Sequence, residues 1–142
     1  MTPDQWNAVI NTNLNSLFNM TQPIWGGMRD RSFGRVICIS SINGQKGQMG
    51  QANYSAAKAG DIGFVKALAQ EGAAFGITVN TICPGAIRTN IGERTYRRNL
   101  EKVTWDLKMP DKWPPHLGRP AEASEVADLV AFLASDDSKY IT

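Results

Sequence analysis

Residues 39–58 read ISSINGQKGQMGQANYSAAK, and three side chains in this stretch stand at a telling spacing. Ser41 precedes Tyr54 by thirteen residues, and Lys58 follows Tyr54 by four. Residues four apart in a helix lie on one face, one turn from each other. A lysine cation beside a tyrosine favours the phenolate. With a serine hydroxyl arriving from a separate strand end, the pattern predicts a site that moves a proton onto or off an alcohol oxygen.

Two apolar runs on either side of this stretch predict strands. Residues 35–40 (RVICIS) and 77–83 (ITVNTIC) are continuous and rich in β-branched residues, which is typical of strands buried on both faces of a parallel sheet. Three glycines, Gly44, Gly47 and Gly50, predict a flexible loop between the first strand and Tyr54. Helical patterns before, between and after the strands indicate an α/β protein with right-handed crossovers.

Three helices are expected around these strands. The first covers residues 2–28, where Thr2 and Gln5 form a capping box, and the second covers residues 54–75 and is ended by Gly76. Ser124 is predicted to cap the last helix. The side chains expected to face inward are Ile62, Val65 and Ala69 in the second helix and Val126, Leu129, Val130 and Leu133 in the last.

Composition narrows the class of protein. The 142 residues are 42% hydrophobic and 20% charged, as in a globular domain, and their net charge of +2 is too small to indicate nucleic acid or an anionic membrane as a partner. No apolar run is long enough to span a bilayer. Cys38 and Cys83 lie in apolar runs, which predicts buried, reduced thiols and a cytoplasmic protein. A single histidine argues against a metal site.

The motifs, taken in order, resemble those of the short-chain dehydrogenase/reductase family over essentially the whole chain. They are Asn13 in INTNLNSLFNMTQ, Ser41 in GRVICISSINGQKG, Tyr54 and Lys58 in NYSAAKAG, and Pro84-Gly85 in ITVNTICPGAIRTN. Among the branches of the family, the chain looks most similar to acetoacetyl-CoA and 3-oxoacyl-carrier-protein reductases. The resemblance implies a doubly wound, Rossmann-like parallel sheet. It also implies an NAD(P)-dependent oxidoreductase that transfers a hydride between a nicotinamide cofactor and a carbonyl or secondary alcohol, here a 3-oxoacyl thioester.

The resemblance also implies roles for four residues. Tyr54 would donate a proton to the carbonyl oxygen, or accept one from the alcohol. Lys58 would hold the nicotinamide ribose hydroxyls, and Ser41 would polarise the substrate carbonyl. Asn13 would hold a water in a proton relay that leads from the lysine to solvent; the alternative is a locally bent helix whose asparagine side chain is satisfied within the helix.

Further residues are implied to bind cofactor and substrate. Pro84, Gly85, Ile87 and Thr89 would form the nicotinamide wall beyond the second strand, unless they make only a simple turn. Gln48 and Gln51 would face the acyl group, or else be solvated loop residues. Basic side chains beyond the second strand would meet CoA phosphates or an acidic carrier protein, or form a solvated helix face. These are Arg88, Arg94, Arg97 and Arg98.

The family pattern is incomplete in this sequence. No G-x-x-x-G-x-G pyrophosphate loop follows a strand, and the chain stops at DDSKYIT, which in the family leads into a final strand. We therefore expect residues 1–142 to form a single partial domain that lacks the N-terminal glycine-rich βαβ unit and the last strand. A lid segment is expected at about 89–118.

Several questions stay open at this point. NADP is slightly favoured over NAD by the resemblance alone. Relatives carry a tyrosine after Pro-Gly where this chain has Ala86, so a sugar, polyol or cyclic alcohol is an alternative substrate. A further alternative is an inactive, truncated chain with only a structural or oligomerisation role. The resemblance implies a dimer or tetramer formed through helices 2–28 and 54–75, and the composition gives no reason to expect a nucleic acid, membrane or metal partner.

Overall fold

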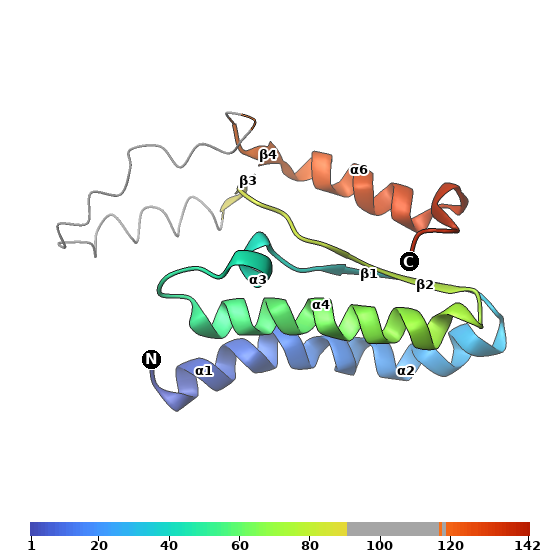
Figure 1. Ribbon diagram of the computed structural model, residues 1–142, viewed down its shortest axis with the longest axis horizontal. Helices are drawn as coiled ribbons and strands as arrows, with labels where there is room; N and C mark the ends of the chain where they lie inside the picture. Colours follow the sequence, from blue (N-terminus) through green and yellow to red (C-terminus); the bar gives the residue numbers. More distant parts are fainter. Residues whose placement is uncertain (91–116, 118) are drawn as a thin grey trace. The chain divides into compact units, whose positions relative to one another are not determined.

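The computed structural model describes residues 1–90, 117 and 119–142. These residues belong to two compact units (Figure 1). The first consists of Met1–Pro84 together with Val130–Thr142, and the second lies within Gly85–Leu129.

The first unit begins with a long helical rod. Helix α1 (Pro3–Ile10) passes through a single π-helical turn, η1 (Asn11–Asn15), into α2 (Ser16–Asp30). The predicted capping box is confirmed: the Gln5 N–H donates to Thr2 Oγ1 at 3.2 Å, and the Thr2 N–H donates to Gln5 Oε1 at 2.9 Å. The rod extends slightly past the expected end at residue 28, and nothing in the apolar spacing predicted the π turn.

The two predicted strands form one parallel pair. Strand β1 (Gly34–Ile39) pairs with β2 (Ile77–Ile82) over its whole length, with Gly34 opposite Ile77. Helix α4 (Ala52–Ala73) connects them, so the three elements make a β-α-β unit. Gly76 ends the helix as predicted, because its φ of +65° is a left-handed conformation that favours glycine.

The stretch between β1 and α4 is not the flexible loop that its glycines suggested. Its first half forms a short helix, α3 (Ile42–Lys46), and Ser41 Oγ caps this helix by accepting from the Asn43 N–H at 3.1 Å. A Cβ at Gly44 would lie 2.6 Å from the backbone carbonyl carbon and oxygen of Lys58. Gly44 therefore allows α3 to pack directly against the backbone of α4, which the sequence pattern did not reveal.

Helix α4 lies between the rod and the two strands and is buried along one face (Figure 1). Of the three side chains expected to face inward, only Val65 is buried, and Ile62 and Ala69 are half-buried. The buried face is turned from the expected one, and it includes a carboxylate and a glycine, which a pattern of apolar residues does not indicate. The buried residues are Ala57, Asp61, Val65, Leu68 and Gly72.

The core of the unit lies where α2 and α4 meet the strands. It contains Met28 from α2, Cys38 from β1, Val65 and Leu68 from α4, and Ile77 and Val79 from β2. Both cysteines are free thiols, but only Cys38 is buried; Cys83, just beyond the end of β2, is half-buried, so the prediction of two buried thiols was wrong for Cys83.

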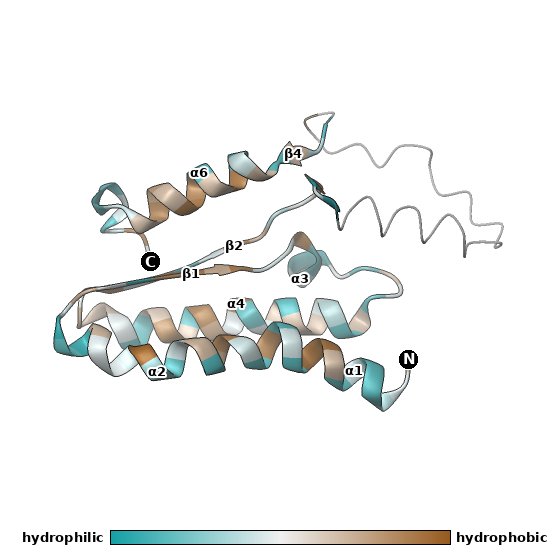
Figure 2. Ribbon diagram, turned by 180° about the vertical axis from the view of Figure 1, so that it is seen from behind, coloured by the Kyte–Doolittle hydropathy of each residue, from teal (hydrophilic) through white to brown (hydrophobic). Residues whose placement is uncertain are grey.

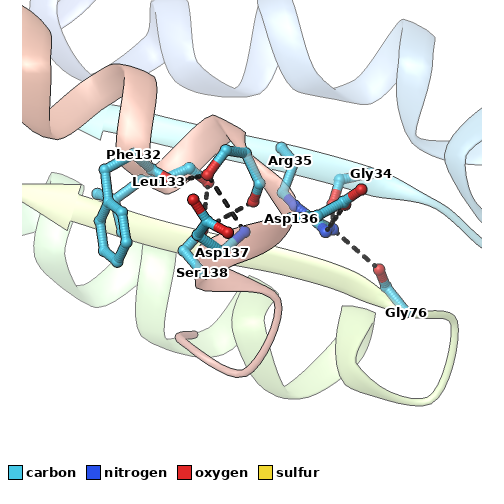
Figure 3. Close-up of polar contacts among 9 residues, drawn as sticks. Gly34, Arg35, Gly76, Phe132, Leu133, Asp136, Asp137 and Ser138 are labelled. Carbon is cyan, nitrogen blue, oxygen red and sulfur yellow. Dashed lines mark hydrogen bonds and ion pairs between the residues drawn. The ribbon is translucent and has the colours of Figure 1, made fainter.

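A cluster of polar contacts ties the end of the chain to the start of β1 (Figure 3). The Arg35 guanidinium donates to the Gly34 carbonyl at 3.0 Å and to Asp136 Oδ1 at 3.4 Å. Asp136 begins the 3₁₀ turn η2 (Asp136–Ser138), where the fully buried Ser138 donates its hydroxyl to the Leu133 carbonyl at 3.0 Å. This turn holds the C-terminal end of the last helix within the unit.

Residues beyond that turn bond to β2. The Asn80 side-chain amide donates to the Ile141 carbonyl at 2.8 Å, and the Val79 N–H donates to Thr142 Oγ1 at 2.9 Å. Asn80 therefore has a structural role.

The second unit contains a short parallel pair that the sequence did not predict, β3 (Ile87–Arg88) with β4 (Ala121–Glu122). The last helix, α6 (Ala123–Ala134), begins before Ser124, so the prediction that Ser124 caps it was wrong. The Glu125 carboxylate instead accepts the N–H of Glu122, just before the helix, at 2.8 Å.

The lid segment expected at 89–118 falls almost wholly outside the described residues. None of the helices in the described ranges has the length and apolarity needed to cross a membrane.

Candidate active site

The carboxyl ends of β1 and β2 meet at one edge of the sheet. The Ser40 N–H donates to the Ile82 carbonyl at 2.8 Å, and the Ile42 N–H donates to the Pro84 carbonyl at 3.0 Å. Ser41 lies between these two bonds and is buried. Ligands of open α/β sheets bind beyond the carboxyl ends of the strands, so Ser41 and Pro84 lie at the edge where a ligand is expected.

Tyr54 and Lys58 approach the same edge from α4. Tyr54 lies in the first turn of the helix, and Lys58 Nζ lies 5.9 Å from the centroid of the Tyr54 ring. The ammonium donates to the carbonyl of Ile39, the last residue of β1, at 3.0 Å. The Ser40 hydroxyl donates to the Lys58 carbonyl at 2.7 Å. These bonds place the lysine beside the strand end that Ser41 follows, so the three residues of the motif are brought together.

Asp61 is a member of this site that the sequence interpretation missed. Its Oδ2 lies 3.0 Å from Lys58 Nζ, and its side chain is fully buried. Burial raises the pKa of the Asp61 carboxyl, and the Lys58 ammonium opposes that rise by stabilising the carboxylate. The signal was present in the sequence: Asp61 falls between Ala57 and Val65 at four-residue spacing, on the face that carries Lys58 one turn earlier.

Asn13 lies at the centre of the π turn η1. Its side-chain Nδ2 donates to the Val9 carbonyl at 3.0 Å. The next residue, Leu14, packs against α4, because a Cβ at Gly60 would lie 2.9 Å from the Leu14 methyl carbons. The π turn therefore contacts α4 two residues beyond Lys58, and π turns are frequent at functional sites. The bond to Val9 also fits a locally satisfied side chain, so the relay role stays a prediction.

The glutamines proposed for the acyl group accept hydrogen bonds from side chains of α3. Gln51 Oε1 accepts from Asn43 Nδ2 at 3.1 Å, and Gln48 Oε1 accepts from Lys46 Nζ at 3.3 Å. Both lie just before Tyr54, and their contact with a substrate stays a prediction.

The loop that follows β2 is divided between the two units. Pro84 belongs to the first unit, whereas Gly85, Ile87 and Thr89 belong to the second, so their role as a nicotinamide wall stays a prediction. Arg88 pairs with Glu122 at 3.0 Å between exposed side chains. The other three arginines of the basic cluster lie outside the described residues.

The residues at this edge fit the ribose of a nicotinamide nucleotide. An ammonium has three N–H donors, and the described residues accept two from Lys58, at Ile39 O and Asp61 Oδ2. The third is left for a hydroxyl at the sheet edge where nucleotides bind. Lys58 is still 12% exposed, so such a hydroxyl can reach it.

The fold and site thus define an α/β protein with a serine, tyrosine and lysine at the carboxyl ends of two parallel strands. A family model described as enoyl-(acyl carrier protein) reductase matches residues 1–142. The chain belongs to the short-chain dehydrogenase/reductase family, as its motifs predicted.

Curated relatives match the chain from end to end. It is 66% identical to an acetoacetyl-CoA reductase of Shinella zoogloeoides and 61% identical to one of Rhizobium meliloti, and covers 56% of each. It is 43% identical to a 3-oxoacyl-[acyl-carrier-protein] reductase of Salmonella typhimurium and covers 55% of it. The chain therefore spans little more than half the length of these relatives.

Proposed function

We propose that this protein is an NAD(P)-dependent reductase of 3-oxoacyl thioesters, of the acetoacetyl-CoA or 3-oxoacyl-carrier-protein type. The observation that carries the proposal is the convergence of Ser41, Tyr54 and Lys58 at the carboxyl ends of β1 and β2. The names of the relatives support the thioester substrate. They give no support to a sugar, polyol or cyclic alcohol.

The side chains divide the chemistry between them. The nicotinamide cofactor, when bound, supplies or accepts the hydride. Ser41 donates a hydrogen bond to the substrate carbonyl and polarises it. Tyr54 donates a proton to the carbonyl oxygen during reduction and accepts it from the alcohol in the reverse direction. Lys58 holds the ribose hydroxyls and favours the phenolate of Tyr54, and Asn13 holds the water through which the proton is replaced.

The remaining binding residues complete the proposal. Pro84, Gly85, Ile87 and Thr89 form the wall against the nicotinamide, and Gln48 and Gln51 face the acyl group. NADP is favoured over NAD by the family resemblance.

We also propose that the protein assembles as a dimer or tetramer through α1, α2 and α4. Large apolar side chains are exposed on the first two helices, and brown segments mark the rod in Figure 2. The exposed apolar side chains are Trp6 of α1 and Phe18, Met20 and Ile24 of α2. Covering them with a second copy would remove apolar surface from water, which stabilises an assembly.

The proposed function is tested by substituting Tyr54→Phe and following the oxidation of NADPH and NADH with acetoacetyl-CoA. Loss of the proton donor is expected to reduce turnover by about 10²–10⁴-fold. Cofactor binding, measured by fluorescence titration, is expected to survive because the ring remains.

The matched control is Tyr140→Phe, because Tyr140 is 99% exposed and lies far along the chain from the site. This variant is expected to turn over normally. Turnover retained in Tyr54→Phe would refute the role of Tyr54. A parent protein that binds neither cofactor would instead favour a purely structural role.

A further inference from the structure

Asp61 is a buried carboxylate on a face of α4 whose buried neighbours one turn away carry no charge. Its neighbours on that face, Ala57 and Val65, are buried residues without charge, and its own side chain is 0% exposed. Oδ2 accepts from Lys58 at 3.0 Å, whereas Oδ1 is buried without a hydrogen-bond partner among the described residues. A buried carboxylate with one oxygen unsatisfied costs stability, so packing alone does not account for an aspartate here.

The titratable groups near Asp61 come from its own helix and from strand β1. Lys58 and Tyr54 belong to its own helix. From β1, the Cys38 thiol faces it: the pKa of Cys38 is raised to about 11, first by burial and second by the Asp61 carboxylate. Cys83, beyond β2, acts on Cys38 in the same direction but more weakly. Among the groups that act on Cys38, Asp61 and Lys58 are the two that carry full charges.

Asp61 is not the only group that holds the Lys58 ammonium in place. The ammonium is already bonded to the Ile39 carbonyl at 3.0 Å. The carboxylate adds a second acceptor, which fixes the orientation of the ammonium, and it places a negative charge beside it. Replacing buried ion pairs by apolar residues is often neutral or stabilising, which indicates that this pair serves something other than stability.

We propose that Asp61 is a positioning residue: its carboxylate orients the Lys58 ammonium and offsets part of its charge, and so sets the pH at which Tyr54 exchanges its proton. The inference rests on the proposed function of Tyr54 and Lys58. Tyr54 and Asp61 are seven residues apart on one face, or about 10 Å along the helix axis. At that distance, a charge in a partly buried site shifts a titration by about one pH unit.

The test is Asp61→Asn in the chain with Tyr96→Phe and Tyr140→Phe, which leaves Tyr54 as its only tyrosine. Asparagine keeps the size and an acceptor oxygen for Lys58 but removes the charge. The ionisation of Tyr54, followed by the ¹³Cζ signal of labelled tyrosine, is expected to move about one unit to lower pH, because Lys58 then acts on it without an opposing charge. This readout needs no turnover, so it separates failure of the inference from failure of the proposed reductase activity.

The matched control is Glu71→Gln, which removes a carboxylate from the same helix at an exposed position. It is expected to leave the Tyr54 titration unchanged. An unchanged titration in a folded Asp61→Asn chain would overturn the proposal, as would an equal shift in the Glu71→Gln chain.

If Asp61→Asn does not fold, the same question is answered without touching Asp61. In the chain with both tyrosine substitutions, the ¹³Cγ signal of Asp61 is titrated together with the ¹⁵Nζ signal of Lys58 and the ¹³Cζ signal of Tyr54. The proposal requires the Lys58 and Tyr54 signals to step at the pH where Asp61 titrates. If the Lys58 and Tyr54 signals do not change at that pH, the proposal is overturned.

Discussion

In the proposed reductase, the Ser41 hydroxyl would serve two partners, because a hydroxyl both accepts and donates hydrogen bonds. As the cap of α3, Ser41 Oγ accepts from the Asn43 N–H at 3.1 Å. Accepting this bond leaves the hydroxyl proton for the substrate oxygen. The cap therefore orients the hydroxyl without using its proton, so Ser41 can cap α3 and still donate to a substrate oxygen, as the proposed function requires.

At the scale of residues, the sharpest pH prediction concerns Glu125. The guanidinium of Arg119, 2.6 Å from each carboxylate oxygen, and the N–H of Glu122 lower the pKa of Glu125 from 4.5 to about 2. A carboxylate with a lowered pKa in the folded state stabilises the fold above its ordinary pKa. That contribution is lost as the pH falls toward 2.

The measurement is a ¹³C titration of the Glu125 carboxyl. Its midpoint is expected near 2 in the parent chain and clearly higher in Arg119→Gln, though still below 4.5 because the Glu122 N–H remains bonded to the carboxylate. The control is Arg88→Gln, which removes a guanidinium that pairs with Glu122, so the Glu125 midpoint should stay low. A parent midpoint near 4.5 would show that the ion pair does not persist in solution.

Site residues were predictable to the extent that they belong to a spaced motif. Ser41, Tyr54 and Lys58 stand in such a motif, and the structure brings them together. Asp61 was not predicted, because a pattern of apolar side chains does not mark a buried carboxylate. A carboxylate on that face is visible in the sequence, but its contact with Lys58 is settled by side-chain rotamers that spacing does not specify.

At the scale of elements, Gly44 decides how closely α3 approaches α4. Its substitution by alanine would place a Cβ 2.6 Å from the Lys58 carbonyl carbon and oxygen, which are backbone atoms that cannot rotate away. Gly44→Ala is expected to lower the free energy of unfolding by about 1–3 kcal/mol, as other overpacking substitutions do. Urea unfolding measures this loss.

Gly63→Ala is the matched control, because a Cβ at Gly63 in α4 meets nothing within 4 Å. The change from glycine to alanine in a helix is expected to stabilise it by up to about 1 kcal/mol. Equal effects at Gly44 and Gly63 would mean that helix propensity, not the close approach of two backbones, governs Gly44.

The long elements were predictable because their signals are local and redundant. The strands begin and end within one residue of the expected positions, and the Thr2 capping box starts the first helix. The short elements were not: α3 depends on a contact between Gly44 and Lys58, fourteen residues apart, and the β3–β4 pair joins Ile87 to Ala121. Contacts between distant residues leave no periodicity in the sequence.

At the scale of the whole molecule, the parallel pairing of β1 with β2 agrees with the predicted α/β class. A doubly wound sheet has more strands than the described residues supply, since they form two sheets of two strands each. The expectation that a glycine-rich βαβ unit and a last strand complete the fold therefore stays a prediction. It depends on segments that the motifs imply and that are not found among the described residues.

The proposed assembly gives the last prediction. Phe18 and Ile24 on α2 are 60% and 49% exposed, and an interface formed by this helix would bury them. Burying the exposed half of each such side chain stabilises by about 0.8–1.5 kcal/mol, so replacing both with lysine should weaken a dimer at least about tenfold. Sedimentation velocity at micromolar protein should then show the smaller species. The control is Tyr140→Lys, which adds a lysine at a 99% exposed position outside these helices and should leave the assembly intact. An unchanged sedimentation coefficient in the Phe18→Lys, Ile24→Lys chain would exclude α2 from the interface.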